Sequence, residues 1–143
     1  MTRIVNLFPD ARAVRKLGMW NSTASQAADG VHWTYTLNEG QSNGTITFGS
    51  VPTVGRVIVV MTDNPASYEK GVENSTTLEK NDEYIAAVPW SPNVKSISLV
   101  NGPVTVLGVA VYESESVWNR VKTLYEAGEI PSPCVSWDWM PRP

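Results

Sequence analysis

The sequence predicts a mainly β protein: an antiparallel β-sandwich of jelly-roll-like form with one C-terminal α-helix and an extended tail. Three observations support this fold class. Residues 31–37 alternate apolar and polar side chains, residues 56–61 and 104–112 are β-branched apolar runs, and helical periodicity is confined to one segment after residue 114. Short strands separated by turn signals, with a single helix, favour a sandwich over an α/β fold.

The first clear strand is predicted over residues 31–37. Its inner face is apolar and consists of Val31, Trp33, Tyr35 and Leu37. His32 is expected on the opposite face, toward solvent. Residues 38–44 have turn chemistry and residues 45–48 resume the alternation, so the two segments are predicted to form a hairpin that begins a meander.

The run over residues 56–61 is apolar enough for a strand that is covered on both faces or lies centrally in a sheet. Residues 95–99 alternate cleanly, and residues 104–112 are rich in β-branched side chains. Residues 101–103 form the turn predicted between these two strands. Residues 84–88 are a weaker strand candidate.

Residues 63–82 are polar and lack sustained periodicity, so they are predicted to form a long loop that is a natural place for a recognition surface. The acidic side chains that crowd this segment and its exit are Asp63, Glu69, Glu73, Glu79, Asp82 and Glu83. Carboxylate oxygens of this kind bind calcium, but their spacing matches no calcium-loop motif, and solvated acids are the favoured interpretation.

The helix is predicted after residue 114. Its apolar face consists of Val117, Trp118, Val121, Leu124 and Tyr125. Ser114 can cap its start, Glu115 suits the positive end of its dipole, and Gly128 can end it. We therefore divide the chain into a β-sandwich domain, residues 1–113, and a helix with a Trp-rich tail, residues 114–143, that packs on the domain or on a neighbouring subunit.

The amino-acid composition limits the classes of partner that the chain is expected to bind. The 143 residues suit one domain, and a hydrophobic fraction of 42% with a charged fraction of 17% is typical of a folded chain. The net charge of −3 and the lack of any Lys/Arg cluster argue against nucleic acid. No run approaches the roughly 18 apolar residues of a spanning helix, and no signal peptide is evident, so we expect a protein made in the cytoplasm and not inserted in a membrane.

The residues that usually carry catalysis are scarce. His32 is the only histidine and Cys134 the only cysteine, so neither a histidine metal cluster nor an intramolecular disulfide is expected. A structural role is favoured for His32, and packing rather than nucleophilic attack for Cys134. No particular pair of carboxylates is indicated for glycoside hydrolysis. The sequence therefore predicts a protein that is not an enzyme and needs no cofactor.

The six tryptophans are the most informative feature of the composition, because large amphipathic rings anchor cores and interfaces or stack on sugar rings. Trp33 and Trp118 are expected in the core. Trp20 and Trp90 lie in predicted loops, where burial and ligand contact are both open, and they are the candidate ligand-binding residues. Near the chain end, the candidate interface residues are Trp137, Trp139 and Met140, predicted to dock against this chain or a neighbour.

Residues 4–10, Ile-Val-Asn-Leu-Phe-Pro-Asp, followed by Gly18-Met19-Trp20, resemble the "N-L-x-P-N … G-W" start of carbohydrate-binding-module-like jelly rolls, which are common in minor tail proteins of phages infecting actinobacteria. The resemblance covers about the first third of the chain. Asp10 replaces the usual asparagine, and Met19 separates the glycine from the tryptophan. The resemblance implies a virion structural protein, on the tail or as a capsid decoration, with a sugar-binding-like fold.

Three hypotheses follow. The leading one is a non-enzymatic phage virion structural protein, located in the virion, that assembles with other virion proteins and forms a homo-oligomer through its C-terminal arm. The alternative is a carbohydrate-binding module whose loop tryptophans, Trp20 or Trp90, stack on a host glycan. The third is an unrecognised hydrolase, which would need a loop carboxylate for turnover.

Overall fold

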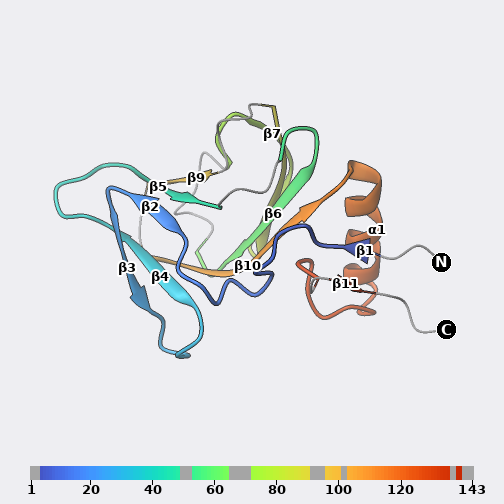
Figure 1. Ribbon diagram of the computed structural model, residues 1–143, viewed down its shortest axis with the longest axis horizontal. Helices are drawn as coiled ribbons and strands as arrows, with labels where there is room; N and C mark the ends of the chain where they lie inside the picture. Colours follow the sequence, from blue (N-terminus) through green and yellow to red (C-terminus); the bar gives the residue numbers. More distant parts are fainter. Residues whose placement is uncertain are drawn as a thin grey trace.

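The computed structural model describes residues 4–48, 53–64, 72–90, 96–100, 103–135 and 138–139. All strand pairs are antiparallel and form one large sheet, one small sheet and a two-stranded ribbon (Figure 1). One helix lies in the described part of the chain, α1 (Glu115–Glu126). The predicted fold class, a mainly antiparallel β-sandwich with one C-terminal helix, is confirmed.

The six-stranded sheet has the strand order β3 (Ser22–Gln26), β4 (Trp33–Leu37), β10 (Val104–Tyr112), β6 (Val57–Thr62), β8 (Tyr84–Pro89) and β7 (Ser75–Lys80). The three-stranded sheet has the order β2 (Gly18–Trp20), β5 (Gly44–Thr47) and β9 (Ser96–Leu99). The ribbon joins β1 (Ile4–Val5) to β11 (Asp138–Trp139). The four strands predicted between residues 56 and 112 are therefore confirmed, with small changes at their ends.

The large sheet is covered on both faces, which explains why its central strands are apolar without alternation. In β6, Ile58 and Val60 point into the core shared with the three-stranded sheet. Val57 and Val59 point to the opposite face, into a second core under α1. All four side chains are fully buried, and burial of each contributes about 1.5–3 kcal/mol. The result is three layers: the small sheet, the large sheet and the helix (Figure 1).

The second core is organised around Trp118 of α1, which is 2% exposed. Its ring meets Tyr84 edge to face, with ring centroids 5.5 Å apart, and stacks on Tyr112 at 6.2 Å. Aromatic pairs of this geometry add about 0.5–1.5 kcal/mol beyond the area they bury. The predicted apolar face of the helix is thereby confirmed as the face that packs on the sheet.

Both predicted ends of α1 are confirmed. The Ser114 hydroxyl accepts a hydrogen bond from the backbone N–H of the third helical residue at 3.3 Å. At the other end Gly128 has φ = 75°, a conformation that favours glycine. There Gly128 N–H donates to the Tyr125 carbonyl at 3.0 Å, and Glu129 N–H to the Leu124 carbonyl at 2.9 Å. These two bonds satisfy helix carbonyls in the manner of a Schellman motif.

The predicted hairpin between residues 31–37 and 45–48 is wrong. β4 pairs with β3 and β10 in the large sheet, whereas β5 pairs with β2 and β9 in the small one. The connection between β4 and β5 therefore crosses from one layer to the other. Alternation specifies which face of a strand is buried, but it does not specify the neighbouring strand.

The predicted loop over residues 63–82 is also partly wrong, because it contains β7. This strand pairs with β8 at the edge of the large sheet, and Val72 forms an isolated bridge with Ile97. Much of β7 is exposed, so its polar sequence suits a strand with one free edge. Residues 65–71 of the predicted loop lie outside the described residues.

The N-terminal segment is joined to the sheet by Asn6, which is fully buried. Its Nδ2 donates to the carbonyls of Val109 at 3.1 Å and Val135 at 3.0 Å. Its Oδ1 accepts from the backbone N–H groups of Phe8 at 2.9 Å and Val111 at 3.0 Å. Because both donors and both acceptor positions are used, one side chain ties together the N-terminal segment, β10 and the C-terminal segment.

The C-terminal segment returns to the start of the chain. In the ribbon, Trp139 pairs with Ile4 and Asp138 with Val5 (Figure 1). Trp137 and Met140, two of the predicted interface residues, lie outside the described residues. The helix and residues 130–135 share the second core with the large sheet. The division of the chain at residue 113 stays a prediction.

Candidate functional site

The outer face of the three-stranded sheet carries the first candidate site. Trp20 pairs with Thr45, and Thr45 pairs with Ser98, so their side chains lie in one row on the same face. Their neighbours Met19, Ile46 and Ile97 point to the opposite face and pack in the main core. Two strand spacings, about 10 Å, separate Trp20 from Ser98.

The row leads into a shallow hollow of about 450 Å³. Ser98 lines it together with Trp90, Asn43, Asn74 and Glu73. The hollow is held by the backbone, since Trp90 N–H donates to the Asn74 carbonyl at 3.0 Å. We call the outer row and this hollow together the tryptophan face.

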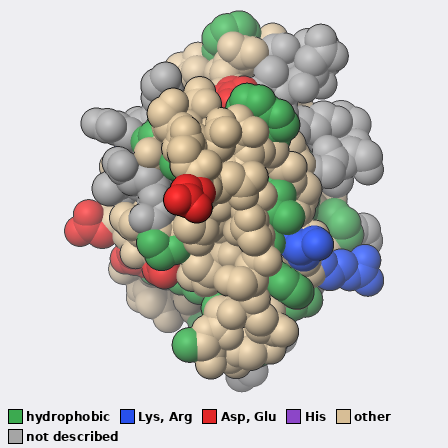
Figure 2. Space-filling model, turned by 90° about the vertical axis from the view of Figure 1, so that its left-hand side faces the viewer, with side chains coloured by type: hydrophobic (Ala, Val, Ile, Leu, Met, Phe, Trp, Pro, Cys, Tyr) green, Lys and Arg blue, Asp and Glu red, His purple; other side chains and the backbone are tan. Residues whose placement is uncertain are grey.

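Trp20 and Trp90 are the most exposed large hydrophobic side chains of the described residues, at 58% and 62%. Of the two possibilities that the sequence left open for them, burial in this chain is therefore excluded, and ligand contact stays a prediction. Figure 2 views the end of the molecule where β2, β3 and the β4–β5 connection lie. The surface there consists mostly of uncharged polar side chains and backbone, with few charged groups.

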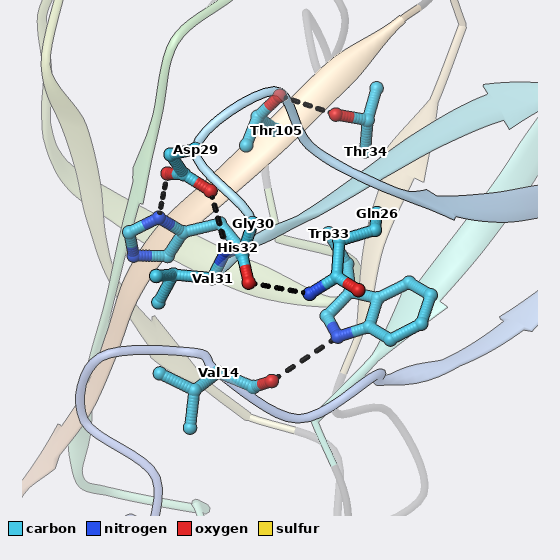
Figure 3. A network of polar contacts seen from close by, with 9 residues as sticks. All are labelled: Val14, Gln26, Asp29, Gly30, Val31, His32, Trp33, Thr34 and Thr105. Atoms are coloured by element: carbon cyan, nitrogen blue, oxygen red, sulfur yellow. Dashed lines mark hydrogen bonds and ion pairs between the residues drawn. The ribbon is translucent and has the colours of Figure 1, made fainter.

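The two tryptophans predicted for the core, Trp33 and Trp118, differ in how deeply they are buried. Trp118 is buried as predicted. Trp33 is half-buried against the main core, and its indole N–H donates to the Val14 carbonyl at 3.2 Å (Figure 3). Trp139 has a backbone pairing with Ile4, and its predicted role in an interface stays a prediction.

A second candidate site surrounds His32, which the structure places differently from the prediction. β4 begins at Trp33, two residues later than expected. Asp29 shapes the preceding turn, because its Oδ1 accepts the backbone N–H groups of Val31 at 2.8 Å and His32 at 2.9 Å. Val31, expected on the inner face, is 38% exposed. The His32 side chain is only 17% exposed, so the prediction that it points to solvent is wrong.

The His32 ring is paired with Asp29. Its Nδ1 lies 2.5 Å from Asp29 Oδ2 (Figure 3). This side-chain hydrogen bond, together with those from the backbone, lowers the Asp29 pKa from 3.8 to about 2. The carboxylate therefore stays ionised near neutral pH and fixes the Nδ1 proton, which leaves Nε2 for another partner. The Asp29-Gly30 dipeptide, a turn signal, could have indicated this arrangement from the sequence.

His32 lines a cavity of about 370 Å³ that also includes Ser132 and Cys134. The Ser132 hydroxyl accepts the Cys134 N–H at 3.0 Å and contacts Met61 Sδ at 3.2 Å. Burial raises the pKa of the Cys134 thiol far above its ordinary value, and its Sγ lies 3.8 Å from the Val59 carbonyl. These contacts agree with the prediction that Cys134 is a packed side chain.

Two of the six acidic residues that the sequence placed in a loop and at its exit, Glu79 and Glu83, contact the helix instead. Glu79 forms an ion pair with Lys122 at 3.0 Å and accepts the Tyr84 hydroxyl at 3.0 Å. Glu83 accepts the hydroxyl of Tyr125, and this bond, followed by burial, raises the Tyr125 pKa to about 12. Within the described ranges, no three His, Cys, Asp or Glu side chains converge as a metal site would require. Glu69 lies outside those ranges.

No protein-family model, curated protein or solved structure matches the chain. In the part of the chain that the structure describes, no helix has the length and apolar character needed to cross a bilayer.

Proposed function

We propose that this protein is a non-catalytic recognition protein that binds a glycan on its tryptophan face. The observation that carries the proposal is the exposure of Trp20, in β2, and of Trp90, directly after β8, beside the polar side chains that line the hollow. Exposed large apolar side chains that are rimmed by polar groups mark interaction sites. An indole ring suits a sugar, since it offers an apolar face to the C–H groups of the sugar ring and an N–H to its hydroxyls.

The groups between the tryptophans suit a ligand rich in hydroxyls. Asn43, Asn74, Ser75 and Ser98 bring amides and hydroxyls to the hollow, and these groups both donate and accept hydrogen bonds. Glu73 is the one charged side chain among the described residues that line the hollow. The face should therefore prefer neutral sugars to acidic ones, because an acidic sugar would approach a carboxylate of like charge.

The test is a titration with arabinan, galactan and peptidoglycan fragments, followed by tryptophan fluorescence and calorimetry. Trp20→Ala and Trp90→Ala should each weaken binding about tenfold, as expected for aromatic anchors of an interface. Val31→Ala, which changes an exposed apolar side chain outside the hollow, is the control. Absence of binding to all three polymers, or equal binding by the double tryptophan variant, would contradict the proposal.

A second candidate function follows from the sequence resemblance. In this hypothesis the protein is a virion structural protein that assembles with other virion proteins or with copies of itself. The ribbon of β1 and β11 favours this role. Among the described residues it has only two strands, so assembly of this kind would add a strand from another subunit along an outer edge of the ribbon. These edges lie at the end of the molecule where the sequence placed the interface.

The assembly hypothesis is tested by deleting residues 136–143. The deletion is kept this short because Ile130, Cys134 and Val135 belong to the second core, and a truncation directly after the helix would remove them as well. The full chain and the shorter deletion are compared by light scattering coupled to size exclusion and by incorporation into particles. An oligomer that the deletion converts to a folded monomer supports assembly through the tail. Identical masses and identical incorporation contradict it.

A further inference from the structure

The cavity beside His32 is separate from the tryptophan face and is lined by five separate parts of the chain: residues 11–12, His32, Met61, Leu107 and residues 130–135. We call it the Arg12–His32 cavity. Its apolar wall is contributed by Met61, Leu107, Ile130, Pro131 and Val135. Its volume of about 370 Å³ is at the lower end of the range of ligand pockets, so it suits a small molecule.

The wall is shaped by an irregularity in β10. The register of β10 against β6 shifts between Val106 and Gly108. A β-bulge of this kind redirects the side chain at the shift, here the half-exposed Leu107. At Gly108 the absence of a side chain lets two segments approach: an added Cβ would lie 3.1 Å from the Ala11 carbonyl oxygen and 3.2 Å from Cys134 Cβ.

The position of these segments is fixed by hydrogen bonds. The Ala11 carbonyl accepts the Val109 N–H at 3.0 Å. The other wall is held by Tyr112, whose hydroxyl donates to the Pro133 carbonyl at 2.5 Å and accepts the Val135 N–H at 3.0 Å. The cavity is therefore formed by the fold itself and needs no rearrangement to receive a ligand.

Two basic side chains stand in this otherwise apolar cavity. Arg12 is exposed and forms no ion pair with the described residues. His32 engages Asp29 through Nδ1, and Nε2 faces away from Asp29 (Figure 3). The Arg12 guanidinium can hydrogen-bond an anionic head group, whereas Nε2 of His32, with the proton held on Nδ1 by Asp29, is a hydrogen-bond acceptor.

We propose that the Arg12–His32 cavity binds a small amphipathic carboxylate, with the carboxylate held by Arg12 and an apolar tail against Met61, Leu107 and Ile130. This assignment follows from charge complementarity at one end and apolar lining at the other. It does not depend on glycan binding, because the cavity shares no lining residue with the tryptophan face.

The test uses octanoate as the probe and the full-length protein, with affinity measured by calorimetry and the site located by methyl NMR of Met61, Leu107 and Ile130. Octanol and octylammonium keep the tail but change the head group. Acetate keeps the head group but lacks the methylenes that octanoate would bury. Its affinity should therefore be at least about a hundredfold lower than that of octanoate. The expected result is saturable binding of octanoate, with a higher affinity than that of octanol or octylammonium.

The matched variants are Arg12→Gln and Arg15→Gln, which make the same charge change. Arg15 does not line this cavity. Arg12→Gln should weaken octanoate binding about tenfold or more through loss of a charge-assisted hydrogen bond, and Arg15→Gln should leave it within about twofold. Leu107→Trp, which fills the cavity from a half-exposed position, should abolish binding while the protein stays folded. Absence of octanoate binding, equal binding of octanol, or an equal effect of the two arginine variants overturns the proposal.

Discussion

Replacing Asn6 by alanine should cost more stability than any other single polar substitution near the N-terminus. The side chain makes four buried hydrogen bonds, to Phe8, Val109, Val111 and Val135. At about 1 kcal/mol net for each bond, the loss is about 4 kcal/mol, a large share of the roughly 5–15 kcal/mol that stabilises an ordinary domain. The effect is large because the four backbone groups lose their partner inside the protein, where water does not replace it.

The assay is urea unfolding followed by tryptophan fluorescence. With a denaturant slope of about 2 kcal/mol per M, Asn6→Ala should lower the midpoint by about 2 M. Asn6→Asp keeps the shape of the side chain, but at neutral pH it places a carboxylate oxygen against the Val109 and Val135 carbonyls. This variant should therefore be destabilised to a similar degree. Asn64→Ala is the control, because the hydrogen bond that Asn64 donates to the Pro103 carbonyl is exposed. A loss below about 1 kcal/mol for Asn6→Ala would refute the reasoning.

Three further predictions concern the cavity and its surroundings. Gly108→Ala should cost about 1–3 kcal/mol through overpacking against Ala11 and Cys134, and an unchanged thermal midpoint would be incompatible with that contact. Cys134 should react slowly with a thiol reagent at about pH 8 until denaturant is added, because burial raises the pKa of the thiol and keeps it protonated even though it lines the cavity; fast labelling of the native protein would show otherwise. The Asp29 pKa is depressed, so its contribution to stability should be complete above pH 3.8 and be lost as the pH falls toward about 2. Carboxyl NMR should place the midpoint near 2 and show it rising in His32→Gln, whereas a native midpoint near 3.8 would rule out the pair.

The strands and the helix could be predicted where the pattern is local. β6 and β10 are continuous apolar runs because both faces of the large sheet are covered; the sequence predicted both strands, and for β6 it indicated either coverage on both faces or a central position in a sheet. The helix was recognised with both of its ends, since Ser114 and Gly128 act on backbone groups within a few residues. The polar edge strand β7 was missed, because an exposed strand needs few apolar side chains.

The candidate sites were only partly predictable. Trp20 and Trp90 were named from the sequence, but their exposure depended on which strands became neighbours. The Arg12–His32 cavity was not foreseen, because its walls come from residues that are far apart in the chain. The motif Asn6-Leu7-Phe8-Pro9 was noticed as a resemblance, and the structure supplies a physical role for its first residue.

The sequence by itself determined the fold class, the central strands, the capped helix and the presence of a single histidine and a single cysteine. Tertiary structure alone decided that β4 and β5 belong to different sheets, that His32 turns toward Asp29, and that Asn6 joins both ends of the chain. The reason is the range of the forces involved. Side-chain periodicity and capping are satisfied within one segment, whereas strand partners, buried hydrogen bonds and cavities are selected by contacts between segments that only folding brings together.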